Sequence, residues 1–369
     1  MTTPEAEAGS VVTRDPAAWG MVGQEHAIAS LRRALRDNHL SHAYLLSGPR
    51  GVGRATLARR LAQALCCENR VGEDGLDPCL ECRPCRQIEA GSWPDVEHIT
   101  IGGVCDERDH KDHVADGSTR LRVCQVRRIE RVATVSPLRS PYRVFIIDAA
   151  DDLQTEAAHA LLKTLEEPPA TALIVLTAGD VQELLPTIRS RCQELILRPV
   201  PVARLTQALI DEGVAPDAAT EAATLSGGRY GLARQMLGDP SLAVLRETIA
   251  ADIARLVAAG RNERFDYAST LARRWSRERE SVMATLDGWR DWWRQALHAT
   301  VDTSGAASEA SPWTPRQAVR ALAAVQTARE HLLDNTNPQL ALEVMLLDVP
   351  RARPGAAAAT VDREEARPA

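Results

Sequence analysis

The sequence has few aromatic residues, no long apolar run and no excess of positive charge. Aromatic residues make up 4% of the 369 residues while 44% are hydrophobic, so the cores must be built mainly from Leu, Ala, Val and Ile. No run of about 18 apolar residues occurs, which argues against a membrane-spanning helix. The formal net charge is −6, so any contact with nucleic acid must come from a local basic patch.

The first residues also lack the features of a secretory signal. Residues 1–16 are acidic and polar, where such a signal needs a basic start and an apolar middle. We therefore expect a cytoplasmic protein that does not associate with a membrane. Cysteines are reduced in the cytoplasm, so the clustered members of the eight cysteines indicate metal ligands before they indicate disulfides.

Length and pattern predict several segments. Strand-like runs are confined to the first half, and beyond Pro201 the pattern is helical, with a glycine-rich break at residues 225–231 and a polar linker at 302–312. The two ends have no apolar period and are expected to be loose. The predicted segments are a tail at 1–15, an α/β domain at 16–200, a short helical module at 201–240, a longer one at 241–349 and a tail at 350–369.

Short apolar runs in the α/β segment alternate with helical patterns. The runs are "AYLLSG" at 43–48, "RVFIID" at 143–148, "TALIVLT" at 171–177 and a last one in "ELILRPVP". The helix expected after the second run is ended by Pro168 and Pro169. Strands alternating with helices of this length predict a parallel sheet that is covered by helices on both faces.

A glycine-rich loop follows the first predicted strand. In "SGPRGVGRAT", Gly48 and Gly53 fit the phosphate-loop pattern G-x-x-x-x-G-K-[ST], and Gly51 lies between them. Glycines let backbone N–H groups turn inward on phosphates at the start of a helix. The loop therefore predicts a nucleotide-type fold, and the competing interpretation is an ordinary strand-to-helix turn.

Three groups that nucleotide hydrolysis needs are altered. Arg54 replaces the loop lysine, and a planar guanidinium does not substitute conservatively for a compact ammonium. Ala55 removes the hydroxyl, and Thr56 points about 100° around the helix. Asp148 could bind Mg²⁺, but Ala149 stands where a water-activating Glu belongs, and loss of such a base alone costs about 10²- to 10⁴-fold in rate. We expect no hydrolysis, which leaves open ATP or ADP binding without turnover.

Four segments together resemble the clamp-loader subunits of bacterial DNA polymerase III, which are of the AAA+ class. They are "MVGQEHAIASLRRAL", "SHAYLLSGPRGVGR", "HALLKTLEEPP" and "IRSRCQ", and the resemblance covers nearly all of residues 19–201. It implies a RecA-like AAA+ domain, a helical lid and an all-α collar domain that assembles a five-subunit ring. The implied partners are the gamma/tau and delta subunits, the sliding clamp, and primed DNA through the assembled complex.

Within that family the motor subunits resemble intact ATPases, while one subunit resembles a stator with a degraded site. The altered residues Arg54, Ala55 and Ala149 select the stator. Arg234 in "YGLARQML" is similar to the sensor arginine of the lid, although it reads equally well as a solvated helix residue. An active motor subunit and a free-standing zinc nucleic-acid-binding module are the alternatives.

The resemblance also implies an arginine finger that acts in trans. The motif "SRC" consists of Ser190, Arg191 and Cys192, and Arg191 would reach the ATP of a neighbouring motor subunit. A planar, permanently charged donor fork suits that task. On local sequence alone, Arg191 would be a surface cation like its neighbour Arg189.

A cysteine cluster predicts a structural zinc site. Cys79, Cys82 and Cys85 have C-x₂-C-x₂-C spacing, and a closed tetrahedral site needs a fourth ligand. The resemblance favours Cys67 over Cys66 as that ligand, within an inserted zinc module at 66–86. A redox C-x-x-C motif is the weaker interpretation, because such motifs neither come in threes nor follow a phosphate-loop helix.

Other clusters have plain structural interpretations. A second metal site at Cys105, His110 and His113 lacks a closed ligand set, so these are expected to be solvated insertion residues. The basic cluster at 127–131 could face DNA or form a wet helix face. Three tryptophans share one helix face and could lie in a core or at an interface, namely Trp289, Trp292 and Trp293.

Overall fold

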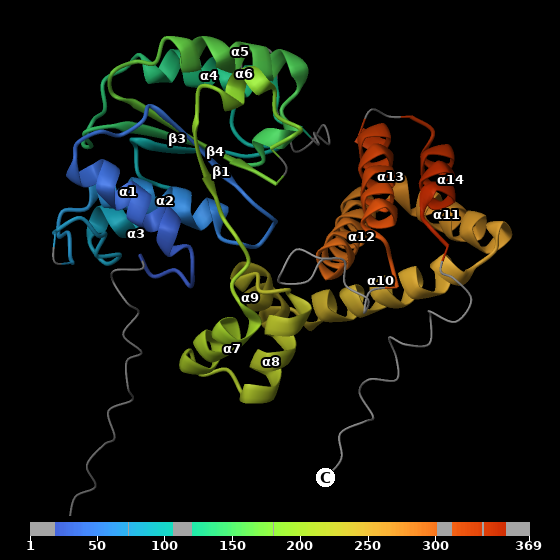
Figure 1. The fold of residues 1–369 in the computed structure, drawn as a ribbon. Coiled ribbons are helices and arrows are strands. Elements are labelled where there is room, and N and C mark those ends of the chain that lie inside the picture. The colour runs from blue at the N-terminus through green and yellow to red at the C-terminus, as the bar shows by residue number, and fades with distance from the viewer. Residues whose placement is uncertain are drawn as a thin grey trace, which may run out of the picture. The chain divides into compact units, whose positions relative to one another are not determined.

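The structure is a computed structural model that describes residues 19–72, 74–105, 120–179, 181–300, 312–333 and 336–351. The chain, drawn in Figure 1, divides into two compact units at Leu237 and Gly238. The predicted tails and the linker at 302–312 lie almost wholly outside these ranges. Within them, no helix combines the length and apolar character needed to cross a bilayer.

The first unit is built on a five-stranded parallel sheet. Its strands are β1 (Ala43–Ser47), β2 (Val96–Ile99), β3 (Arg143–Ile147), β4 (Ala172–Ala178) and β5 (Gln193–Ile196), in the spatial order β2-β3-β4-β1-β5. This confirms the predicted parallel α/β fold class. The sequence did not indicate β2, because Ile99 is the one buried residue along this edge strand and a central strand reads as a continuous apolar run.

Helices cover both faces of the sheet, as Figure 1 shows. Successive residues of a strand point to opposite faces, so Leu46 of β1 packs with Leu57 on one side and Leu45 packs with Leu161 on the other. One face is covered by α1 (Glu25–Arg36), α2 (Arg54–Cys66) and α3 (Arg83–Glu89), and the other by α4 (Val123–Ala133), α5 (Thr155–Glu166) and α6 (Pro186–Arg189).

Three short helices complete the first unit. They are α7 (Val202–Asp211), α8 (Pro216–Leu225) and α9 (Tyr230–Gly238), and they share a small core around Leu205 and Leu209. The turn before α9 contains Gly228 at φ 77°, where the Val200 N–H donates to the Gly228 carbonyl over 2.7 Å. The glycine-rich break predicted at residues 225–231 is therefore the turn that ties this module to the end of the sheet domain.

The second unit is entirely helical within its described residues, as the sequence predicts. Its helices are α10 (Pro240–Ala258), α11 (Arg261–Trp275), α12 (Arg279–Ala299), α13 (Pro315–Leu333) and α14 (Pro338–Asp348). Trp289 and Trp293 of α12 are fully buried in its core, and Trp292 is partly buried against the same core. The sequence left open whether these tryptophans lie in a core or at an interface, and within this unit they lie in the core.

Candidate functional site

The glycine loop lies at the carboxyl edge of the sheet, between β1 and α2. Gly48, Gly51 and Gly53 all have positive φ. A Cβ at Gly48 would lie 2.3 Å from the Leu197 carbonyl oxygen, and one at Gly51 would lie 2.9 Å from Leu232 Cβ. The sequence therefore uses glycine where the backbone is left-handed and other chain segments approach closely.

The residues that open α2 differ from those of a working phosphate loop. The Arg54 guanidinium lies near Gly179, just after the end of β4: a Cβ placed at Gly179 would be 3.4 Å from Arg54 Nη1. The Asp151 carboxylate lies beside the same residue and accepts a hydrogen bond from Gly179 N–H over 2.7 Å. Ala55 and Thr56 occupy the first turn of α2, where Ala55 presents no hydroxyl.

Asp148 follows β3 at the same edge of the sheet. Its carboxylate accepts a hydrogen bond from the Thr177 hydroxyl of β4, and the Thr177 oxygen accepts one from Ala149 N–H over 3.2 Å. Sequence analysis missed both Thr177 and Asp151. A polar side chain at the end of an otherwise apolar strand was the available signal for Thr177.

The start of α9 packs directly on the glycine loop. Gly231 N–H donates a hydrogen bond to the Gly51 carbonyl over 2.8 Å, beside the close approach of Leu232 to Gly51. Arg234, one turn further along α9, forms an ion pair with Glu212 over 3.2 Å, and Glu212 also accepts a hydrogen bond from the Tyr230 hydroxyl. Arg234 is thus held within its own helical module.

Arg191 lies just beyond α6, in the turn before β5. Its guanidinium forms an ion pair with Glu166, the last residue of α5, over 2.7 Å and donates to the Thr187 carbonyl over 2.9 Å. About a third of the Arg191 side chain (34%) stays exposed, so the guanidinium is oriented but accessible. Of the other "SRC" residues, Ser190 donates to the Thr187 carbonyl, and burial raises the pKa of the Cys192 thiol to about 12.

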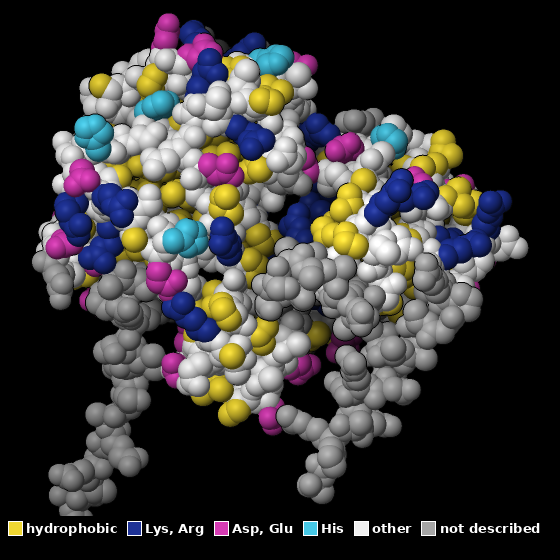
Figure 2. Space-filling view, in the orientation of Figure 1, with side chains coloured by type: hydrophobic (Ala, Val, Ile, Leu, Met, Phe, Trp, Pro, Cys, Tyr) yellow, Lys and Arg dark blue, Asp and Glu magenta, His cyan; other side chains and the backbone are white. Residues whose placement is uncertain are grey.

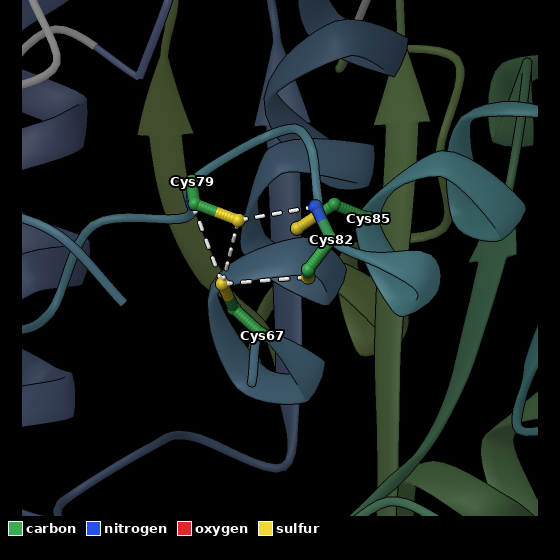
Figure 3. A group of neighbouring side chains, drawn as sticks. All are labelled: Cys67, Cys79, Cys82 and Cys85. Atoms are coloured by element: carbon green, nitrogen blue, oxygen red, sulfur yellow. Dashed lines mark hydrogen bonds between the residues drawn. The ribbon is translucent and has the colours of Figure 1, made fainter. Parts of the chain in front are cut away.

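Four cysteine sulfurs come together in the insertion after α2, as Figure 3 shows. All four lie within 4.8 Å of one another, and they belong to Cys67, Cys79, Cys82 and Cys85. The Cys67 sulfur is 3.5 Å from that of Cys79 and 3.8 Å from that of Cys82. A tetrahedral zinc site with Zn–S bonds of about 2.3 Å has sulfur atoms about 3.8 Å apart, so these distances fit the metal.

The surroundings of the sulfurs also suit a metal. Backbone N–H groups donate to them, from Cys79 to Cys67 and from Cys82 to Cys79, both over 3.3 Å. Burial raises the pKa of the Cys67 and Cys85 thiols, whereas at Cys82 backbone N–H groups such as that of Cys85 outweigh burial and bring the pKa to about 7. Thiolate is the form that binds metal. The residues present therefore fit a Cys₄ zinc site.

Cys66 does not face this cluster. Its thiol donates to the Ser140 hydroxyl over 3.2 Å, and burial raises its pKa to about 11. Helix α2 ends between the two cysteines, and Cys67 adopts an extended conformation that directs it away from the helix. Of the two residues between which the sequence left a choice, the structure brings Cys67 to the other three.

A buried carboxylate anchors the cysteine insertion, and sequence analysis missed it. Asp77 is fully buried, accepts a hydrogen bond from the Trp19 indole over 2.8 Å and forms an ion pair with Arg32 of α1 over 3.2 Å. From α2, the Gln63 amide donates to the Cys85 carbonyl over 2.7 Å. The insertion is therefore fixed to the helical layer on one face of the sheet.

The structure describes part of the predicted cysteine and histidine cluster and all of the basic cluster at 127–131. His110 and His113 lie outside the described residues. Cys105 is buried, so the prediction that it is a solvated residue is wrong. In the basic cluster, Arg128 of α4 forms an ion pair with Glu97 over 2.5 Å, while Arg127 and Arg131 remain at the helix surface.

The sheet domain is similar to parts of known DNA polymerase III subunits. Residues 23–201 match the family model described as "DNA polymerase III, delta subunit". The DNA polymerase III gamma subunit of Buchnera aphidicola is 37% identical over 172 residues, which is 47% of this chain and 42% of that protein. The delta-prime subunit of Bacillus subtilis is 32% identical over 193 residues, 52% of this chain and 53% of that protein.

The matched part of the chain thus spans about half the length of these two relatives. Among solved structures, a DNA polymerase III gamma subunit-related protein of Thermotoga maritima aligns with 88% of this chain and 99% of its own, at 18% identity and a TM-score of 0.34. Residues 23–201 are therefore similar to this family model, and the sheet domain is similar to parts of DNA polymerase III gamma, tau and delta-prime subunits alike.

Proposed function

We propose that this chain is a delta-prime subunit of a bacterial DNA polymerase III clamp loader, which helps to load the sliding clamp onto primed DNA without hydrolysing ATP itself. The observation that carries the proposal is the change of Arg54 and Ala55 beside a loop that keeps its glycine geometry, together with Ala149 after β3. Hydrolysis needs a hydroxyl for Mg²⁺ and a positioned base, and neither is present at these positions.

The contribution of the subunit is proposed to be Arg191. Its guanidinium is held by Glu166 and by the Thr187 carbonyl, yet keeps an exposed side. A charged fork oriented in this way can stabilise the phosphoryl transition state on an adjoining motor subunit. The proposed partners are accordingly gamma/tau and delta subunits in a ring that acts on the clamp and primed DNA.

Zinc is proposed to be structural in this subunit. Four cysteine ligands close a tetrahedral site and leave no position for water or substrate. The metal would supply cross-linking of the insertion, while Asp77 and Gln63 fix the insertion to α1 and α2. For the glycine loop we propose at most binding of ATP or ADP without hydrolysis. The start of α9 already packs on Gly51 and would compete with a nucleotide for this loop.

The second candidate is an active motor subunit, because the relatives include gamma and tau subunits as well as a delta-prime subunit. ATPase assays separate the two. The isolated chain should show no turnover above background if it is a stator. Turnover by the chain alone, abolished by Asp148→Ala, would establish the motor instead.

The finger is tested in a loader reconstituted with gamma/tau and delta subunits. Arg191→Ala should lower turnover at the adjoining ATP site by roughly 10³- to 10⁵-fold, because such fingers are worth that much in rate. Arg189→Ala is the matched control, since Arg189 is a partly exposed neighbour that donates to the Gln182 side chain. Equal DNA-stimulated ATPase in the two variants would contradict the assignment.

A further inference from the structure

Helix α14 of the second unit is apolar on both sides. Its inner side packs into the core through Leu342 and Leu346. Its outer side carries Leu340, Val344 and Leu347, which are 60%, 45% and 46% exposed. These three residues have i, i+4, i+7 spacing and so form one stripe, about 10 Å long from the rise per residue. An outer face of this kind is typical of a contact surface.

The stripe ends at a basic pocket of about 250 Å³. Leu347 belongs to both, and the pocket is lined by four arginines against one carboxylate, namely Arg261, Arg264, Arg320, Arg351 and Asp348. Within the described ranges, one ion pair involves an arginine of this pocket: Arg320 pairs with Asp348 over 2.7 Å. Figure 2 shows hydrophobic and basic side chains next to one another over the region of α13 and α14.

Arg264 lines this pocket and is almost fully buried. It donates to the backbone carbonyls of Leu346 (2.6 Å) and Val349 (2.8 Å) at the end of α14 and of Leu256 (2.9 Å) in α10. Burial and the charge of Arg351 lower the pKa of its guanidinium. Carbonyl groups satisfy its donors without cancelling its charge, so the pocket keeps an excess of positive charge that an anionic group would offset.

We propose that the α14 stripe and the arginine pocket together bind a segment of a partner protein that carries apolar side chains next to a carboxylate. Arg261 and Arg351 are exposed and can present their donor forks to a carboxylate in the pocket. The apolar side chains of the segment would cover Leu340, Val344 and Leu347, which span two helical turns. This inference does not depend on the proposed function.

Nucleic acid fits the surface less well. A phosphate backbone would satisfy the arginines, but it offers nothing to cover three exposed aliphatic side chains on the adjoining stripe. An acidic amphipathic segment satisfies both halves at once, since helix-in-groove recognition uses apolar anchors at this same spacing.

The test is a selection with a random dodecapeptide library displayed on phage, with the full chain as target. Enriched peptides should carry Asp or Glu beside apolar residues. Their affinity, measured by fluorescence polarisation, should fall about tenfold or more for the double variant Arg261→Glu with Arg351→Glu, because charged hydrogen bonds are lost and replaced by repulsion. Leu340→Ser with Val344→Ser should weaken the same peptides.

The matched control is Arg273→Glu with Arg277→Glu. These exposed arginines lie in the last turn of α11 and two residues beyond it, far along the helix from Arg261. Their substitution changes the net charge by the same amount and should leave binding unchanged. Arg351→Gln, a milder change beyond the end of α14, keeps the test valid if the double reversal unfolds the second unit.

Three outcomes would overturn the proposal. Enriched peptides could lack acidic residues, or they could bind the Arg261/Arg351 variant as tightly as the wild-type chain. In the third, oligothymidylate binds the wild-type chain and loses affinity in that variant while no peptide does, which would assign the pocket to nucleic acid instead.

Discussion

Two adjacent cysteines have opposite surroundings and should differ in their effect on metal binding. The Cys67 sulfur lies close to those of Cys79, Cys82 and Cys85, whereas the Cys66 thiol is hydrogen-bonded to the Ser140 hydroxyl. Cys67→Ser should therefore lose zinc from protein prepared under reducing conditions, and Cys66→Ser should keep about one equivalent. Elemental analysis of the purified variants measures both.

The same pair of variants should differ in stability. Loss of a structural metal removes folding free energy directly, so Cys67→Ser should unfold at a clearly lower temperature. Cys66→Ser removes one weak donor and should cost about 1 kcal/mol or less. Equal zinc content in the two variants, or zinc absent from the wild-type chain, would rule out the four-sulfur site.

Spacing predicts three of these ligands and the family resemblance predicts Cys67 as the fourth, but neither indicates the residues around them. The C-x₂-C-x₂-C spacing fixes Cys79, Cys82 and Cys85, because local spacing determines which thiols can share one metal. Asp77 and Thr177 gave no comparable signal, since their partners are 58 and 29 residues away in the chain. Such contacts depend on tertiary packing, which a local pattern does not encode.

At the scale of elements, the turn before α9 should tolerate no side chain. Gly228 has φ 77°, and a Cβ there would lie 2.0 Å from the Val200 carbonyl oxygen. Gly213, in the turn between α7 and α8, has φ 88° but nothing within 4 Å of the same position. Gly213→Ala should therefore cost about 1–2 kcal/mol for the left-handed backbone alone.

Gly228→Ala carries that cost and a backbone collision in addition, for a total of roughly 2–5 kcal/mol. Denaturant unfolding of the two variants measures the difference. If both alanines cost the same, the close approach of Val200 to this turn is not a feature of the folded protein in solution.

Element prediction succeeded where burial is complete and missed one of the two edge strands. β1, β3 and β4 are continuous apolar runs because both faces of each strand are covered. β2 and β5 are edge strands with mixed burial, and only β5 was indicated, by the apolar residues of "ELIL". The break before α9 was predictable because consecutive glycines mark a turn.

At the scale of the whole chain, two units with separate cores should unfold in separate steps. Trp289 is fully buried in the core of the second unit. Trp289→Ala should destabilise that unit by about 3–5 kcal/mol and lower one calorimetric transition, leaving the other in place. Trp292→Ala, at a partly buried position of the same helix, should shift that transition less.

Metal removal should act on the other transition. The four cysteines belong to the first unit, and Asp77 and Gln63 fix their insertion to α1 and α2. A strong zinc chelator should therefore lower the transition that Trp289→Ala leaves unchanged. Each kcal/mol lost should shift it by about 2–4 °C for a unit of this size. The Cys67→Ser chain is the control: because its site is already broken, the same chelator should not move its transitions further. A chelator effect that persists in that variant, or one that lowers the Trp289-sensitive transition, would mean that the metal acts somewhere other than at these sulfurs.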